Sequence, residues 1–525
     1  MNKTAFDVAI IGYGPTGLVL ASALGQLGHS VVVIERWPTL YGMPRLSHID
    51  DETARIIQAT SDVDHALRGS EAIPHFTFVN AEGLMLTQAG EGTKQGKCGF
   101  PADISIYQPD IEEAIDARVQ GLPSVTRMMG CELNGFSQTA GDVQLTVTPK
   151  DSAVTQEISA RFVVGCDGAR STVRELLNIG RSDEGFNERW LNIDTRILRP
   201  IDAAFRKTIQ YCDPARGHMH LPIGTERLRF ELAVLKHEDA DAFLRPEFAW
   251  QWLRTQHDLG PDDVQIIRQI VYQFGAQMAD RWRSDRILIA GDAAHTMPPY
   301  MGQGACSGMR DGYNLAWKLD LILRGVSHPD LLDSYETERR PHVAAITQMS
   351  LGLGRIANEH DAEKARQRDA YMRANPPRKP VIPGMVAGIV DLDRSPMAGE
   401  IFPQGRVRLG EMEDRFDTVM GNGFVLLSRT DHSTAFGPDR LALLRRIGVK
   451  FVALDMPAFV DIDGVYGDLL GEGRAAVLAR PDFTLFGTAN GPDDVPALVD
   501  RLLARLHVQE QASADAEARH GQLTG

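Results

Sequence analysis

The sequence lacks several features that would point to particular classes of protein. It has five cysteines and no Cys-x-x-Cys pair among them, so neither a disulfide framework nor a cysteine-based zinc site is predicted. No apolar stretch approaches the ~18 residues of a membrane-spanning helix, and the chain enters its first predicted strand without a signal peptide. We therefore expect a soluble, cytoplasmic protein with free thiols and without a metal centre.

Positive charge is also scarce. The chain has 55 basic and 70 acidic residues, a net charge of −15, and no lysine- or arginine-rich block. This balance argues against nucleic acid or an anionic membrane as a partner. The composition, with 43% hydrophobic and 24% charged residues over 525 positions, is that of a globular protein with about two to four domains.

The N-terminal stretch has the pattern of a dinucleotide-binding unit. An apolar run at 8–11 precedes the turn, and a helical pattern and a second apolar run follow it before Glu35. The turn reads Gly12-Tyr13-Gly14-Pro15-Thr16-Gly17. Gly12 allows the turn, Gly14 lets the backbone approach a pyrophosphate, and Gly17 lets the helix pack closely on the strand. Glu35 would accept a hydrogen bond from a ribose hydroxyl; the fingerprint alone leaves FAD and NAD both open.

Two later motifs follow predicted buried strands. They read Cys166-Asp167-Gly168-Ala169-Arg170-Ser171 and Ala290-Gly291-Asp292-Ala293-Ala294-His295. The carboxylate of Asp292 can accept a hydrogen bond from a ribityl or ribose hydroxyl; the alternative is a cap for a following helix.

The order of these motifs resembles that of the FAD-dependent aromatic hydroxylases, the class A flavin monooxygenases. The resemblance covers about residues 5–350 and is nearest to the 3-(3-hydroxyphenyl)propionate and phenol hydroxylase group. That placement rests on Pro44-Arg45, Ile49-Asp50-Asp51-Glu52, Tyr211-Cys212-Asp213-Pro214 and Gly308-Met309-Arg310-Asp311. The resemblance implies an α/β fold in which a Rossmann-like FAD-binding domain carries an inserted β-sheet substrate domain and is followed by a C-terminal thioredoxin-like domain.

These domains are expected to interleave along the chain. We expect the FAD-binding domain at 1–75, 101–188 and 284–375, and the substrate domain at 76–100 and 189–283. A linker at 376–394, the thioredoxin-like domain at 395–508 and a flexible tail at 509–525 would follow. Since the thioredoxin-like domain has no cysteine, it cannot perform dithiol chemistry. A structural role or oligomerisation, for example as a homodimer, is expected instead.

The resemblance implies FAD as the cofactor, NADH or NADPH as a transient electron donor that passes near Asp167, and O2 as the oxidant. The residues expected to bind FAD are Gly12, Gly14, Pro15, Thr16, Gly17, Glu35, Arg36, Arg45, Gln108, Asp167, Gly168, Gly291, Asp292, Pro299, Gly302, Gln303, Gly304 and Ala305. Backbone N–H groups at 302–304, beside a helix predicted from about Ser307, would stabilise negative charge on the reduced flavin. The alternatives are a surface charge for Arg45, a helix cap for Gln108 and a plain loop at 302–304.

The implied reaction is hydroxylation of a small phenol or phenolic acid through a flavin C4a-hydroperoxide. A base near the substrate hydroxyl would make the ring more nucleophilic. The candidates for this catalytic site are His220, Tyr211, Tyr272, His48 and the carbonyl of Pro299. His218 and His220 lie two apart in a predicted strand and should share a face. Arg196, Arg227 and Arg229 are candidates for binding a substrate carboxylate.

Three other interpretations stay open. The first is a monooxygenase of a non-phenolic substrate, such as a hydroxypyridine, a polyketide or an antibiotic. The second is a flavin halogenase, although Trp250-Gln251-Trp252 is not followed by Ile-Pro and lies in the substrate segment. The third is a non-catalytic FAD-binding protein, because fold does not determine function.

Overall fold

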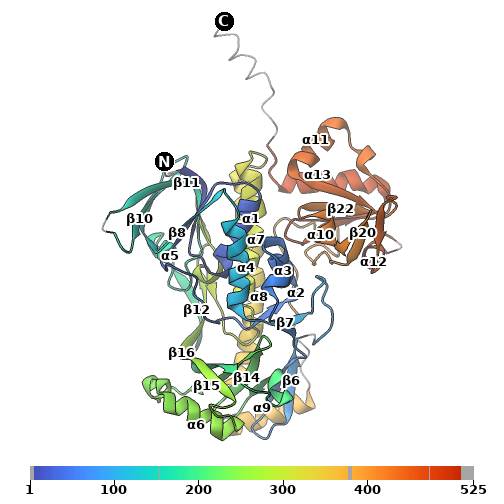
Figure 1. Cartoon of the computed structure of the whole chain (residues 1–525). Coiled ribbons are helices and arrows are strands. Elements are labelled where there is room, and N and C mark those ends of the chain that lie inside the picture. The colour runs from blue at the N-terminus through green and yellow to red at the C-terminus, as the bar shows by residue number, and fades with distance from the viewer. Residues whose placement is uncertain (1–4, 91, 153, 376–380, 472, 510–525) are drawn as a thin grey trace. The chain divides into compact units, whose positions relative to one another are not determined.

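The computed structural model describes residues 5–90, 92–152, 154–375, 381–471 and 473–509. These residues group into two compact units, whose elements are labelled in Figure 1. Unit 1 comprises the chain up to Asn314 together with Arg339–Gly384 and Pro403–Arg406. Unit 2 comprises Leu315–Glu338, Met385–Phe402 and the chain from Val407. Helices α7 (Gly304–Leu323) and α8 (Asp333–Ala357) therefore contribute residues to both units.

A mostly parallel sheet forms the first part of unit 1. Its strands follow the order β17-β18-β11-β1-β2-β8, and β10 and β9 extend it from β11. Strand β1 pairs in parallel with both β11 and β2, and its residues 8–10 are fully buried, as expected for the centre of a parallel sheet. The strands are β1 (Ala5–Ile11), β2 (Val31–Glu35), β8 (Val125–Met129), β9 (Cys131–Gln138), β10 (Val143–Pro149), β11 (Gln156–Gly165), β17 (Arg283–Ser284) and β18 (Ile287–Ile289).

The helices of unit 1 begin at residues that favour helix starts. Pro15 and Pro109 lie in the first turns of α1 and α4, where proline costs no hydrogen bond. Asp50 caps α2 by accepting from the backbone N–H of Thr53 at 2.9 Å. The helices are α1 (Pro15–Gln26), α2 (Asp51–Thr60), α3 (Val63–Ala66), α4 (Gln108–Gln120), α5 (Thr172–Leu176), α6 (Pro246–His257) and α9 (Ala362–Ala374).

A second sheet of unit 1 is largely antiparallel and runs in the order β19-β16-β12-β15-β14-β13-β5-β6. One of its faces packs under α6 in a core that includes Phe230, Leu232 and Leu253. Its strands are β5 (Phe76–Val79), β6 (Met85–Ala89), β12 (Arg181–Ile197), β13 (Thr208–Tyr211), β14 (His218–Ile223), β15 (Arg227–Val234), β16 (Val264–Ala279) and β19 (His295–Thr296). A small sheet of β3 (His48–Asp50), β7 (Asp103–Ser105) and β4 (Glu71–Ala72) completes the unit's strands within the described residues. This second sheet is the substrate sheet expected from the sequence.

Unit 2 has the topology of a thioredoxin-like domain. Its sheet runs in the order β23-β22-β25-β26, with β22 parallel to β23 and antiparallel to β25. The strands are β22 (Phe424–Ser428), β23 (Val449–Ala453), β25 (Ala476–Ala479) and β26 (Leu485–Ala489), beside a smaller sheet of β20 (Arg406–Leu409), β21 (Met412–Arg415) and β24 (Phe459–Asp461). The helices are α10 (Phe416–Met420), α11 (Pro438–Ile447), α12 (Val465–Leu470) and α13 (Val495–Arg505). The fold class expected from the sequence is thereby confirmed.

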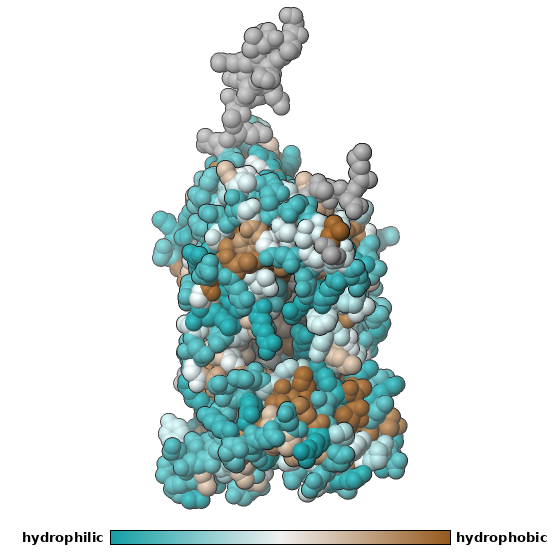
Figure 2. All heavy atoms as spheres, turned by 90° about the vertical axis from the view of Figure 1, so that its left-hand side faces the viewer, coloured by the Kyte–Doolittle hydropathy of each residue, from teal (hydrophilic) through white to brown (hydrophobic). Residues whose placement is uncertain are grey.

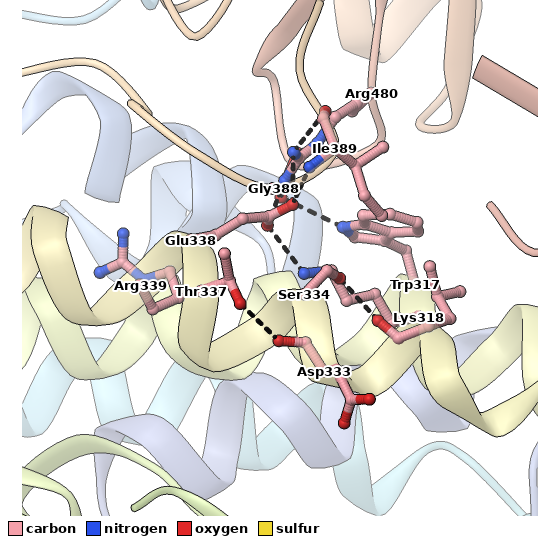
Figure 3. Close-up of polar contacts among 12 residues, drawn as sticks. Trp317, Lys318, Asp333, Ser334, Thr337, Glu338, Arg339, Gly388, Ile389 and Arg480 are labelled. Carbon is pink, nitrogen blue, oxygen red and sulfur yellow. Dashed lines mark hydrogen bonds and ion pairs between the residues drawn. The ribbon is translucent and has the colours of Figure 1, made fainter. Parts of the chain in front are cut away.

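A buried ion-pair network lies inside unit 2. Glu338 of α8 accepts hydrogen bonds from Lys318 Nζ of α7 at 2.7 Å and from both terminal nitrogens of Arg480 at 2.9 and 2.8 Å. Figure 3 shows Lys318 and Arg480 converging on this carboxylate. Arg480 also pairs with Asp482, which accepts a hydrogen bond from Trp317 Nε1 as well. All three side chains at the centre of the network are fully buried.

This network accounts for a difference from the expected domain boundaries. Residues 315–338 were expected in the FAD-binding domain and 385–394 in the linker, whereas both segments group with unit 2. They do so because Lys318, Glu338 and Ile389 bond to Arg480, which comes from the thioredoxin-like part. Residues 376–380 of the expected linker and 510–525 of the expected tail lie outside the described residues.

The surface of the protein is mainly hydrophilic on the face drawn in Figure 2, where hydrophobic side chains gather chiefly in the lower part of the view. Within the described residues, none of the helices combines the length and the apolar character needed to cross a membrane. The five cysteines are free thiols.

Candidate functional site

A cavity of about 570 Å³ lies within unit 1, a volume in the usual range of about 300–1,000 Å³ for ligand sites. It opens at the carboxyl ends of parallel strands β1, β2 and β11, where ligands bind in such sheets. Most of the residues expected to bind FAD line it. They are Gly12, Gly14, Pro15, Thr16, Glu35, Arg36, Arg45, Gln108, Asp167, Gly168, Asp292, Pro299, Gly302, Gly304 and Ala305.

The three fingerprint glycines have different physical roles. A Cβ on Gly12 would lie 2.4 Å from the carbonyl oxygen of Cys166, and the residue has φ +99°; a Cβ on Gly17 would lie 2.2 Å from the carbonyl oxygen of Gly12. Both glycines are therefore required by the protein's own packing. A Cβ on Gly14 would meet nothing within 4 Å. Gly14 precedes α1 without a side-chain cap, so its bare backbone fits a cavity wall against which a phosphate lies.

Glu35 and Gln108 are held in fixed orientations beside this turn. The carboxylate of Glu35 accepts from the backbone N–H groups of Tyr13 at 2.8 Å and Trp37 at 2.9 Å. Gln108 Oε1 accepts from the N–H groups of Arg45 and Leu46 at 2.9 and 2.7 Å. Gln108 therefore fixes the position of the loop that carries Arg45. The guanidinium of Arg45 lies 3.9 Å from the centroid of the exposed Tyr41 ring.

Asp292 faces the cavity from the turn after β18. Its carboxylate is accessible from the cavity and has no hydrogen-bond partner among the described residues. The surrounding protein desolvates this carboxylate, which raises its pKa. It does not cap α7, which begins at Gly304. Gly302, at φ +64°, and the first residues of α7 also line the cavity. The site therefore offers a free carboxylate and a helix N-terminus on the same wall.

The remaining expected FAD contacts lie at or behind the lining. Asp167 binds the start of α5, accepting from Ser171 Oγ at 2.5 Å and from the N–H of Val173 at 3.0 Å. Gly17, Gly291 and Gln303 are not among the lining residues. The N–H of Gly291 donates to Asp311 at 3.0 Å, and Gln303 accepts from Arg310 at 3.0 Å.

The other end of the cavity is apolar and aromatic. Mostly alternate residues of the substrate sheet line it, as the two-residue period of strands favours, with Thr77 as the exception: Phe76, Thr77, Phe78, Thr208, Gln210, Met219, Leu221, Arg229, Glu231 and Phe274. Two of the catalytic candidates, His48 and Pro299, also line the cavity. His48 Nε2 pairs with Asp103 at 3.0 Å. The carbonyl of Pro299 accepts from the N–H of Gly302 at 2.8 Å.

His220 and Tyr211 lie elsewhere. His218 and His220 share a face of β14, as expected, but it is the face under α6, opposite the cavity. The ring of His220 lies 5.3 Å from Phe205 and 5.7 Å from His257, centroid to centroid, and burial lowers its pKa to about 4. Tyr211 stacks on His218 at 4.5 Å. Because neighbouring strand residues point to opposite faces, the cavity receives Gln210 and Met219 instead.

Tyr272, another candidate, is on β16 two residues before the cavity residue Phe274, but is not itself a lining residue. Its hydroxyl is buried without a hydrogen-bond partner in the part of the chain that the structure describes. Of the arginines considered for a substrate carboxylate, Arg229 lines the cavity. Its guanidinium is already bonded to Asp194 at 2.6 Å and to the carbonyls of Arg45 and Pro44 at 2.8 Å each.

Glu231 is a cavity residue that the sequence reasoning missed. It is 6% exposed, and burial raises its pKa to about 7, against the opposing charge of Arg229. The signal in the sequence was its alternation with the apolar residues Phe230 and Leu232. No group of three or more His, Cys, Asp and Glu side chains in the described ranges is arranged to hold a metal ion.

Comparison with known proteins identifies the family. The family described as FAD binding domain matches residues 5–350, and the family described as HcaD C-terminal domain matches residues 399–505. A probable NADH-specific resorcinol 4-hydroxylase of Rhodococcus jostii is 36% identical over 522 residues, which cover 96% of each chain. The chain belongs to the FAD-dependent aromatic hydroxylases.

Other members of the family are similar over the same length. The 3-(3-hydroxy-phenyl)propionate/3-hydroxycinnamic acid hydroxylase of Comamonas testosteroni is 31% identical over 582 residues, covering 95% of this chain and 97% of that one. Among solved structures, aklavinone-11 hydroxylase with FAD and aklavinone has a TM-score of 0.77 and 22% identity, covering 96% of this chain and 100% of that one. This structural similarity supports the fold described above for this chain.

Proposed function

We propose that this hydroxylase adds one oxygen atom to the ring of a small phenol, with FAD, NADH and O2. The proposal rests on one observation: a single cavity is lined both by the FAD-binding part and by the substrate sheet. Glycine turns and helix N-termini of the FAD-binding part line one end, and aromatic and aliphatic side chains of the substrate sheet line the other. The relatives named for resorcinol and for hydroxyphenyl substrates support a phenol as the substrate class.

The residues of the cavity suit FAD in stated roles. The N-terminus of α1 at Gly14 would hold the pyrophosphate, Glu35 a ribose hydroxyl and Asp292 a ribityl hydroxyl. The N-terminus of α7 would stabilise negative charge on the reduced ring system. When bound, FAD would supply the oxygen chemistry: reduction by NADH, reaction with O2 at flavin C4a and transfer of one oxygen atom to the ring.

The chain's own residues then bind and orient the substrate. Phe76, Phe78 and Phe274 offer apolar surface to an aromatic ring, and such surface excludes water from the reacting atoms. The guanidinium of Arg229 donates to Asp194 and to two backbone carbonyls, which leaves at most one of its five N–H groups for a substrate carboxylate and no bidentate contact. An uncharged phenol therefore suits this end of the cavity better than a phenolic acid.

The proposed function is tested by measuring NADH oxidation by the purified, FAD-loaded protein with a panel of phenols and hydroxypyridines. We expect phenols such as resorcinol to stimulate oxidation and to yield a product heavier by one oxygen atom. Phenolic acids serve as the matched comparison and should stimulate less. Stimulation without an oxygenated product, or by hydroxypyridines alone, would contradict the proposal.

Removing the free carboxylate of Asp292 should weaken FAD binding. For Asp292→Ala we expect roughly 10- to 100-fold weaker binding, since a hydrogen bond to a charged group contributes about 1.5–3 kcal/mol. The measurement is a titration of apoprotein with FAD. The exposed Asp262 provides a control variant, Asp262→Ala, that should bind FAD like the wild type. Unchanged affinity in Asp292→Ala would remove Asp292 from the FAD site.

A further inference from the structure

Glu231 places a buried carboxylate on the wall of the cavity in which the substrate is proposed to bind. It lies in β15, in register with Asn192 of β12 and Met219 of β14, and its side chain lines the apolar end of the cavity. Met219 and Phe274 line the same wall. A carboxylate in such surroundings is costly to bury unless it has a partner.

The partners of Glu231 inside the protein leave one oxygen available. Asn192 Nδ2 donates to Oε1 at 3.0 Å. The nearest cation is Arg229 Nη1, 3.8 Å from the same Oε1, which is beyond hydrogen-bond distance, and this guanidinium is already bonded to Asp194 and two carbonyls. Within the described residues, Oε2 has no hydrogen-bond partner. The carboxylate can therefore accept one more donor from a molecule in the cavity.

The groups around Glu231 leave its protonation state adjustable near neutral pH. Arg229 and Arg268 favour its ionised form, whereas burial and the charge of Asp194 oppose it, and the balance raises its pKa to about 7. Tyr300, which also lines the cavity, is a further titratable group that interacts with Glu231. Burial raises the pKa of Tyr300, so it stays neutral when Glu231 titrates.

Building on the proposed phenol hydroxylation, we propose that Glu231 is a catalytic base, whose Oε2 accepts a hydrogen bond from a substrate hydroxyl and takes its proton as oxygen enters the ring. The substrate O–H bond breaks and its electron pair forms a ring carbonyl, while ring π electrons form the new C–O bond. The O–O bond of the oxygen donor that FAD, NADH and O2 would supply breaks at the same time, and its electron pair stays on the oxygen atom left on the donor. Glu231 then returns the proton to the carbonyl oxygen when the substituted carbon loses its own proton to water and the ring becomes aromatic again. The carboxylate is regenerated, the proton lost to water balances the charge left on the oxygen donor, and no reactant beyond NADH and O2 is consumed.

The first test is Glu231→Gln, which keeps the shape of the side chain and an acceptor for Asn192. We expect kcat/KM for hydroxylation to fall about 100-fold or more, within the range of about 10²–10⁴ for general-base catalysis, with FAD content unchanged. A base must be ionised, so the wild-type rate should fall as pH drops through about 7, and Glu231→Gln should lose this acid limb. More acidic, fluorinated phenols should recover part of the rate in the variant.

Two further variants distinguish a base from a structural residue. Glu238→Gln changes a carboxylate that pairs with Arg216 outside the cavity and should keep the wild-type profile. Asn192→Ala leaves the carboxylate in place but removes a donor that lowers its pKa, so the acid limb should move to higher pH. The role of Glu231 would be overturned if Glu231→Gln lowered kcat/KM equally at every pH and kept the acid limb of the pH–rate profile. It would also be overturned if the acid limb of Asn192→Ala lay at the same pH as that of the wild type. A wild-type enzyme that no phenol stimulates would overturn the proposed function itself.

Discussion

Glu338→Ala is expected to lower the free energy of unfolding by about 3–5 kcal/mol, because breaking a buried ion pair leaves uncompensated charge in the interior. The substitution would strand Lys318 and Arg480, which are fully buried beside it. Asp482 would remain as the single carboxylate bonded to Arg480 among the described residues. The measurement is the midpoint of urea unfolding, followed by circular dichroism.

The pH dependence of this effect has a definite sign. Burial opposes ionisation of Glu338, but the charges of Arg480 and Lys318 outweigh it and lower its pKa from 4.5 to about 2. A lowered carboxylate pKa stabilises the folded state above the ordinary pKa and loses that contribution as pH falls through the folded value. The difference between wild type and Glu338→Ala should therefore be full at neutral pH and shrink between about pH 4.5 and 2.

Thr337→Ala is the matched control, because Thr337 is the exposed neighbour of Glu338 on α8 and bonds only to the carbonyl of Asp333 among the contacts drawn in Figure 3. A change within about 0.5 kcal/mol is expected for this surface position. Glu338→Gln keeps the shape and removes the charge, and should lie between the wild type and Glu338→Ala. Equal stability of Glu338→Ala and Thr337→Ala would show that the network does not stabilise unit 2.

The second large effect is expected for Gly12→Ala, which should yield protein that is poorly folded and free of flavin. The new Cβ would lie 2.4 Å from the carbonyl oxygen of Cys166 and 2.9 Å from Cα of Asp167, and the backbone at φ +99° disfavours any side chain. Since the colliding atoms belong to the backbone after β11, the two central strands β1 and β11 would have to move apart. Thermal unfolding and flavin absorbance per protein measure both consequences.

Gly14→Ala separates the fold from the cofactor. A methyl group at Gly14 meets no atom of the protein within 4 Å, so thermal stability of the flavin-free protein should match the wild type. Any loss of flavin in Gly14→Ala then reports the space that the pyrophosphate needs. A Gly12→Ala protein that is as stable as Gly14→Ala would contradict the packing argument.

Much of the fold could be predicted because its signals are local. A strand, the glycine turn, a helix and Glu35 follow one another within 5–35, and the structure places them as β1, α1 and β2. The thioredoxin-like domain that the resemblance implied for the C-terminal region is also present, as unit 2. The assignment of 315–338 to unit 2 could not be read from the sequence, because it depends on Arg480, more than a hundred positions away.

The sequence by itself determined the family and the glycine turn after β1, and it predicted most of the residues that line the cavity beside that turn, since these are set by short motifs at the ends of strands. Only the tertiary structure decided which face of the substrate sheet meets the cavity. A strand's two faces differ by one residue in register, so His220 and Tyr211 lie under α6 while Glu231 and Gln210 line the cavity. Which face is enclosed depends on what packs against it, and for this sheet that is α6 on one side and the FAD-binding part on the other.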